Sequence, residues 1–93
     1  MTDTVASVTG DDEQQLDHND PRPLYEQAAA QLRVQIKSGQ LAGRLDSEWM
    51  IAARYHVSRD TVRRALEILV KEGLVTATRG RGTFARPPGE RDD

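Results

Sequence analysis

Residues 58–84, SRDTVRRALEILVKEGLVTATRGRGTF, decide the fold of this 93-residue chain. Placed at helical angles, the apolar side chains of the first half form one stripe, made of Val62, Ala65, Leu66, Leu69 and Val70. The hydroxyl of Ser58 can accept a hydrogen bond from a free amide of the first turn, and Gly73 suits a left-handed stop. This pattern predicts an amphipathic helix over residues 58–72.

Charged side chains occupy the rest of this predicted helix. Arg59 and Arg63 stand four residues apart on one flank of the apolar stripe. The opposite, solvent-facing side carries Asp60, Arg64 and Glu67. Such a face can be an ordinary solvated one with local pairs, Asp60 to Arg64 and Arg63 to Glu67, each worth about 0.3 kcal/mol. The helix alone therefore leaves open whether its arginines bind a partner.

The residues after this helix indicate a β-hairpin. Residues 74–78 are short and β-branched, and residues 83–85 resume a strand after two glycines. The turn exposes Arg79 and Arg81 on either side of Gly80, with no acid beside them. A purely structural turn needs glycine for a positive φ, but it has no need of guanidinium groups. Guanidinium groups bind phosphate and the negative potential of a narrow minor groove favourably, so the turn is a candidate DNA contact.

A second helix is predicted upstream, from residues 46–48 to Tyr55, followed by a tight turn. Its apolar spacing is what two short helices crossing steeply through a brief turn require. We expect Val57 to fill the corner. His56 holds the position where such corners often carry glycine, and histidine tolerates the left-handed conformation better than a β-branched residue does. Because no cysteine is present and no histidine has ligand-spaced carboxylates, we interpret His56 as a turn residue rather than a metal ligand or base.

A first helix is predicted from near Pro23 to residues 37–38, with a buried stripe that repeats every four residues. The stripe consists of Leu24, Ala28, Leu32 and Ile36. Residues 40–45 form a short connector, which we expect Leu41 and Leu45 to anchor in the core. The predicted fold class is mainly α with a small β-wing, a three-helix winged helix-turn-helix.

Charge is distributed unevenly along the chain, although the formal total is only -2. Residues 1–20 hold six acids and no lysine or arginine, whereas residues 21–86 hold twelve lysines or arginines against six acids. We expect residues 1–20 to be a disordered acidic tail and residues 87–93 a flexible tail or linker stub around the basic domain 21–86. The N-terminal tail either improves solubility or competes with DNA for the basic face.

Several classes of protein are disfavoured by what the sequence lacks. No run resembles a signal peptide or is long enough to cross a membrane, so we expect no membrane partner and a cytoplasmic protein. The absence of cysteine fits that compartment. No nucleophile, base and orienting group can be assembled, so we expect neither an enzyme nor a bound cofactor or metal.

The predicted elements resemble the DNA-binding domain of the GntR family of bacterial transcriptional regulators. The resemblance runs from residues 23–27 to about Arg86. Its most specific blocks are VSRDTVRRAL at 57–66, EGLV at 72–75 and RGRGTF at 79–84. It implies a sequence-specific regulator, most simply a repressor, which binds a palindromic operator in double-stranded DNA as a homodimer. The recognition helix 58–72 would lie in the major groove, and the wing 74–86 would contact the minor groove.

The resemblance also implies roles for side chains of the recognition helix. Arg59 and Arg63 are expected at base edges or adjacent phosphates, and Ser58 and Thr61 at phosphates. Arginine can bond guanine bidentately, which contributes roughly 1 to 3 kcal/mol of discrimination. Helix N-terminal amides likewise suit phosphate oxygens.

For the wing, the resemblance places Arg79, Gly80 and Arg81 in the minor groove. Asp60 varies the usual chemistry of the recognition helix. It could accept a hydrogen bond from a cytosine amine, repel phosphate, or pair with Arg64. We therefore count both Asp60 and Arg64 among the candidate DNA-binding residues.

The chain departs from the family pattern in two ways. Trp49 stands early in the second helix, where the family commonly has a basic residue that helps contact DNA. An exposed Trp49 and Met50 pair could dock another protein together with the wing, which is our alternative function, whereas burial against the first helix would exclude it. Family members also normally carry a C-terminal domain that binds a metabolite, and we expect no effector-binding domain here. The chain would then be an excised domain or a small free-standing regulator.

Overall fold

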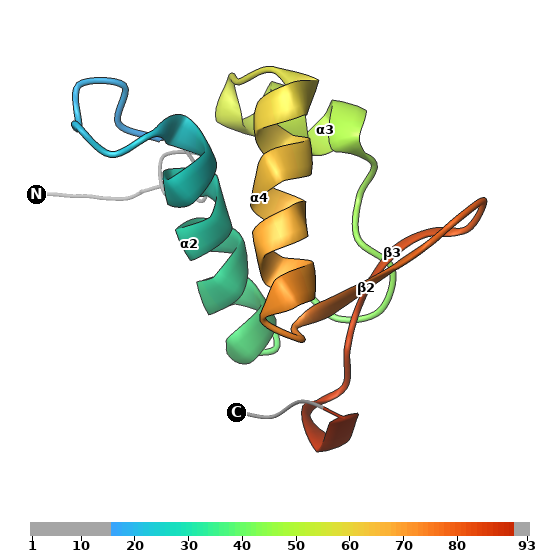
Figure 1. Ribbon diagram of the computed structural model, residues 1–93. Helices are drawn as coiled ribbons and strands as arrows, with labels where there is room; N and C mark the ends of the chain where they lie inside the picture. Colours follow the sequence, from blue (N-terminus) through green and yellow to red (C-terminus); the bar gives the residue numbers. More distant parts are fainter. Residues whose placement is uncertain (1–15, 91–93) are drawn as a thin grey trace, which may run out of the picture.

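The computed structural model describes residues 16–90 of the chain. Its elements follow in the order α2 (Leu24–Lys37), α3 (Glu48–Tyr55), α4 (Arg59–Lys71), β2 (Val75–Thr78), β3 (Gly82–Ala85) and the 3-10 turn η2 (Pro88–Glu90). Figure 1 shows the three helices packed together and the hairpin of β2 and β3 projecting from them as a wing. The predicted three-helix winged helix-turn-helix is confirmed.

The N-cap of α4 matches its predicted position, and α3 begins within its predicted start at residues 46–48. The hydroxyl oxygen of Ser47 accepts a hydrogen bond from the amide of Met50 at 3.2 Å, and that of Ser58 accepts one from the amide of Thr61 at 3.1 Å. Each serine stabilises its helix because its hydroxyl accepts a hydrogen bond from a first-turn amide that has no partner within the helix. Local sequence therefore determines where both helices begin.

The turn between α3 and α4 confirms the interpretation of His56. This residue adopts the left-handed conformation with φ 59°, the one positive φ among the described residues other than glycine. The amide of Val57 then donates to the carbonyl of Ala52 at 3.0 Å, which closes the corner. The tight turn orients α4 relative to α3.

The core lies where α2, α3, α4 and the start of β2 meet. Its largest fully buried side chains come from all four elements: Tyr55, Leu32, Ile51, Leu69, Val62 and Val75. Ala28, Leu32 and Ile36 of the predicted α2 stripe are also buried, while Leu24 is only partly covered. Burial of these apolar surfaces supplies the main driving force for folding.

The wing is a tight hairpin with a definite register. Val75 pairs with Ala85 and Thr78 with Gly82, so the loop consists of residues 79–81. The amide of Arg81 donates to the carbonyl of Thr78 at 3.0 Å and closes the loop. Gly80 and Gly82 have φ of 80° and 105°, values that glycine adopts without steric cost.

The connector before α3 lies alongside the wing, an arrangement that the sequence analysis did not predict. The amide of Leu45 donates to the carbonyl of Thr83 at 2.8 Å, and the amide of Ala85 donates to the carbonyl of Gly43 at 2.8 Å. Arg44 thereby forms an isolated bridge with Phe84. Leu45 is buried and Leu41 is partly buried against the core, as expected.

The described part of the chain includes residues on the N-terminal side of the predicted domain boundary at residue 21. Leu16 is buried in the core. The side chain of Gln27 forms hydrogen bonds with the segment after Leu16. Its Oε1 accepts from the amide of Asp17 at 2.8 Å, and its Nε2 donates to the carbonyls of Asp17 and Arg22 at 2.9 and 3.0 Å. Leu16, which falls within the predicted tail, is therefore buried, and a buried glutamine satisfies the backbone of Asp17, whereas residues 17–19 are exposed.

The remaining terminal predictions fall largely outside the described part of the chain. Residues 1–15 and 91–93 lie beyond it, so the acidic tail stays a prediction there. The segment Pro88–Glu90 forms a short 3-10 turn with no buried residue. Within residues 16–90, no helix is both long and apolar enough to span a bilayer.

Candidate nucleic-acid interface

The first turn of α4 presents two hydroxyl groups and the positive end of the helix dipole. Ser58 and Thr61 lie together there, with their hydroxyl oxygens 3.0 Å apart. Ser58 is exposed and Thr61 partly so. Exposed hydroxyls and first-turn amides at such an end are suited to phosphate oxygens.

Arg59 and Arg63 are held next to each other by a carboxylate of α3. The Oε1 atom of Glu48 lies 3.5 Å from a guanidinium nitrogen of Arg59 and 3.2 Å from one of Arg63. A hydrogen bond to Glu48 raises the pKa of Arg63, and Asp60 lies 3.0 Å from its other terminal nitrogen. The two arginines thus share one anchored position on the exposed flank of α4.

The sequence analysis did not identify Glu48 as part of this site. The sequence places Glu48 only within the predicted helix start at residues 46–48. Glu48 and Arg63 are 15 positions apart. Their contact follows from how α3 and α4 cross, so residue spacing along one helix could not predict it.

Arg64 faces a different way from Arg59 and Arg63. Its Cζ lies 4.2 Å from the ring centroid of Tyr25 on α2, a cation–π contact. The predicted Asp60–Arg64 pair is wrong, because Asp60 bonds Arg63 instead. The predicted Arg63–Glu67 pair also does not form among the described residues. Arg64 and Arg63 thus take tertiary partners on α2 and α3, and Asp60 takes a different local partner.

Trp49 and Met50 are exposed, with 67% and 56% of their surface accessible. Burial of this pair against the first helix is therefore excluded. Trp49 instead lies under Arg59, whose Cζ is 4.7 Å from the centroid of the indole. The indole thus extends the surface that carries the arginines of α4.

The wing tip carries two arginines whose surroundings differ from those of the α4 arginines. Arg79, Gly80 and Arg81 are all exposed at the end of the hairpin. Between residues 16 and 90, neither arginine forms an ion pair. The predicted wing contacts are therefore accessible, and their charge is not neutralised by a neighbouring carboxylate.

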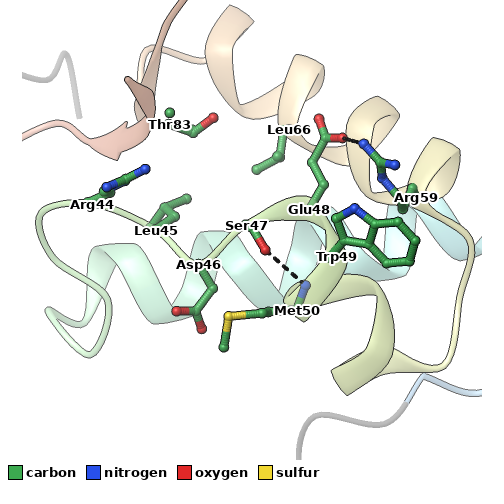
Figure 2. A pocket seen from close by; sticks show the side chains of 11 residues that line it. Arg44, Leu45, Asp46, Ser47, Glu48, Trp49, Met50, Arg59, Leu66 and Thr83 are labelled. Carbon is green, nitrogen blue, oxygen red and sulfur yellow. Dashed lines mark hydrogen bonds and ion pairs between the residues drawn. The ribbon is translucent and has the colours of Figure 1, made fainter. Parts of the chain in front are cut away.

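A hollow of about 530 Å³ connects the start of α3, α4 and the wing. Figure 2 shows its lining, with Arg44 on one side and Trp49 and Arg59 on the other. Gly82 and Thr83 of the wing line the same hollow. Arg59 of α4 and strand β3 of the wing thus line one hollow.

The chain matches a known family over most of the winged helix. Residues 24–85 match the model for bacterial regulatory proteins of the gntR family. The HTH-type transcriptional repressor NagR of Bacillus subtilis is 47% identical over 70 residues, which is 73% of this chain and 29% of that protein. The mannosyl-D-glycerate transport/metabolism system repressor MngR of Escherichia coli is 37% identical over 67 residues, covering 70% of this chain and 28% of that protein. The chain thus spans less than a third of either repressor.

Solved structures show the same architecture. The AraR DNA-binding domain in complex with operator ORX1 superposes with a TM-score of 0.71 and 28% identity, over 77% of this chain and 94% of that one. YtrA from Sulfolobus acidocaldarius, a GntR-family transcription factor, superposes with a TM-score of 0.68 and 29% identity, over 76% of this chain and 77% of that one. The chain therefore belongs to the gntR family of bacterial regulatory proteins, and its described part is a winged helix-turn-helix DNA-binding domain.

Proposed function

We propose that this chain is a sequence-specific transcriptional regulator that represses by occupying an operator in double-stranded DNA. The observation that carries the proposal is the presence of two exposed pairs of arginines, one on the recognition helix and one at the wing tip. Arg59 and Arg63 lie on α4, and Arg79 and Arg81 lie at the wing tip. The AraR domain, which shares the fold, was solved with an operator, and NagR and MngR are repressors.

In this proposal α4 enters the major groove with its N-terminal half. That groove distinguishes all four base pairs, and a guanidinium can bond guanine through two atoms. Arg59 and Arg63 are the base-reading candidates because Glu48 and Asp60 hold them in defined directions. Ser58 and Thr61 would position the helix end on a phosphate.

The wing would follow the backbone into the adjacent minor groove. Arg79 and Arg81 flank Gly80, whose missing side chain permits a close approach of the loop to DNA. A narrow minor groove has an enhanced negative potential that attracts arginine. These contacts would add affinity and sensitivity to groove width rather than read single bases.

We further propose that two copies bind one operator with two-fold symmetry. A single α4 reads only a few base pairs, and pairing of half-sites on a palindrome is the usual way in which helix-turn-helix proteins extend the site. Because bacterial chromosomal DNA lies in the cytoplasm, that compartment is where the protein would act.

Selection of bound sequences from a random pool of DNA duplexes tests the proposed function directly. A two-fold symmetric site should be enriched, and binding should weaken steeply as salt increases because phosphate contacts release counterions. Recovery of no preferred sequence, together with weak salt dependence, would refute the proposal.

Trp49 and Met50 support a second candidate function, the docking of another protein. Their exposure of 67% and 56% leaves an apolar pair on the surface, and such pairs often mark interaction sites. Docking of this kind would depend weakly on salt, in contrast to binding through several phosphates. The same salt titration therefore distinguishes the two candidates.

A further inference from the structure

Two of the side chains that line the hollow between α3, α4 and the wing have no role in the DNA contacts proposed above. Arg44 comes from the connector, and Trp49 comes from the first turn of α3 (Figure 2). The hollow lies between Arg59, a candidate base reader, and Thr83 in strand β3 of the wing. A DNA strand that contacts both α4 and the wing would have to pass this position.

Arg44 is fixed at the edge of the hollow by its backbone. It bridges Phe84 of β3, and its neighbour Leu45 donates to the carbonyl of Thr83 at 2.8 Å. Its guanidinium lies over Gly82, where an added Cβ would come within 3.1 Å of Nε. The glycine thus leaves room for the guanidinium beside the hollow.

The acids that line the hollow are already bonded to other arginines. Asp46 forms an ion pair with Arg54, and Glu48 contacts both Arg59 and Arg63. Arg44 forms no ion pair with any residue between 16 and 90, and it is exposed. Its charge is therefore available to an anion from outside the protein.

Trp49 forms the apolar wall on the other side. The Arg59 guanidinium covers one part of the indole at 4.7 Å, yet 67% of the tryptophan surface stays accessible. An indole presents a broad apolar face and one N–H donor. This combination suits a deoxyribose packed on the ring beside a phosphate.

We propose that the hollow is a seat for the sugar–phosphate backbone of DNA, located between the recognition-helix contacts and the wing contacts. Arg44 binds a phosphate oxygen, and the Trp49 indole packs against the adjacent deoxyribose. DNA is the occupant because the hollow adjoins Arg59 and the wing and because Arg44 adds an unneutralised positive charge. The inference deepens the proposed function and rests on it.

The first test compares Arg44→Ala with Lys37→Ala in the full chain. Both remove one charge from an exposed side chain, but Lys37 ends α2 and does not line the hollow. Loss of a charge-assisted phosphate contact should weaken binding about tenfold for the selected operator and for a mixed-sequence duplex alike. The slope of log K against log salt should also fall by about one, whereas Lys37→Ala should leave both quantities unchanged.

The second test uses Trp49 as its own reporter, because it is the single tryptophan of the chain. Acrylamide, a neutral quencher, should quench its fluorescence strongly in the free protein and much less when the operator duplex is saturating. Trp49→Phe should retain most of the affinity, and Trp49→Ala should lose more. Circular dichroism of each variant confirms that the helices remain folded.

The outcomes separate the seat from the function on which it rests. If the parent chain binds no duplex, the proposed function fails, and the seat fails with it. If the parent binds DNA while Arg44→Ala behaves like the parent or Trp49 stays equally accessible to acrylamide, only the seat is overturned. Persistent accessibility of Trp49 in the DNA complex would instead favour a protein partner at this surface.

Discussion

The arginines of the recognition helix and those of the wing have opposite surroundings. Arg59 and Arg63 share Glu48, and Arg63 also contacts Asp60, so both point in directions set by the protein. Arg79 and Arg81 stand in a glycine-containing loop and form no ion pair within the described chain. The first pair is pre-oriented at the cost of neutralised charge, and the second keeps its full charge but little fixed orientation.

This difference explains how one small domain can combine specificity with general affinity. Hydrogen bonds to base edges require a guanidinium in a defined plane, because bidentate geometry tolerates little misalignment. Phosphate and minor-groove potentials act on charge and need less exact placement. We therefore expect the helix arginines to decide which sequence binds and the wing arginines to strengthen binding to all sequences.

The largest expected effect is that of Arg63→Ala on operator binding. Loss of a bidentate base contact should cost about 1 to 3 kcal/mol and should relax preference at one base position. Titration of the operator and of its single-base variants measures both quantities. An unchanged base preference would show that Arg63 is not a base reader.

A smaller and more uniform loss is expected for Arg81→Ala. Removal of an unpaired cation should weaken operator and mixed-sequence duplexes by a similar factor, about 1 kcal/mol, and should lower the salt slope by about one. Filter binding or fluorescence anisotropy at several salt concentrations provides the measurement. A loss confined to the operator would contradict the assignment of Arg81 as a general contact.

Glu48→Gln should lower the ratio of operator affinity to mixed-sequence affinity. Without the carboxylate, Arg59 and Arg63 lose their anchor and the surface loses a negative charge, so binding to mixed-sequence DNA should strengthen while discrimination falls about threefold or more. The ratio of operator to mixed-sequence affinity is the quantity to measure.

Glu67→Gln is the matched control for Glu48→Gln. It removes the same charge from an exposed position of α4 that forms no ion pair with Arg59 or Arg63 and only raises the pKa of Arg63 through its charge. Equal ratios for the two variants would mean that the effect of Glu48 is only one of net charge.

The smallest expected effect is on the free energy of unfolding, through the ion pair between α2 and the end of α4. Arg33 of α2 binds Glu72 through two hydrogen bonds of 2.8 and 2.7 Å, which couple α2 to the end of the recognition helix. Because this pair is partly exposed, Glu72→Gln should lower the free energy of unfolding by only about 0.5 kcal/mol. Base preference should not change, since no arginine of the DNA-facing surface contacts Glu72.

The pH dependence of that pair follows from its hydrogen bonds. The Arg33 guanidinium lowers the pKa of Glu72 below its ordinary value of 4.5, so the folded state favours the ionised carboxylate. The stabilisation is therefore present above that pH and is lost as pH falls through the lowered pKa of the folded state. Urea unfolding of the parent and of Glu72→Gln should give a difference at neutral pH that disappears in acid.

Much of the fold could be predicted because its determinants are local. Ser58 caps its helix through the amide three residues ahead, His56 accepts a left-handed turn, and Gly80 permits a tight loop. Each of these preferences depends on backbone energetics within a few residues. The roles of individual arginines in DNA contact remain predictions, although their exposure on α4 and the wing agrees with them.

The sequence by itself determined the order of the elements, their ends and the candidate cationic residues. Only the tertiary structure decided which partners those residues have. Glu48 reaches Arg63 across 15 positions and Gln27 binds Asp17 across 10. Such contacts depend on the crossing of helices and on the path of the chain around the core, which periodicity along one helix does not encode. For the same reason, only the packed structure placed Arg44 and Trp49 around one hollow.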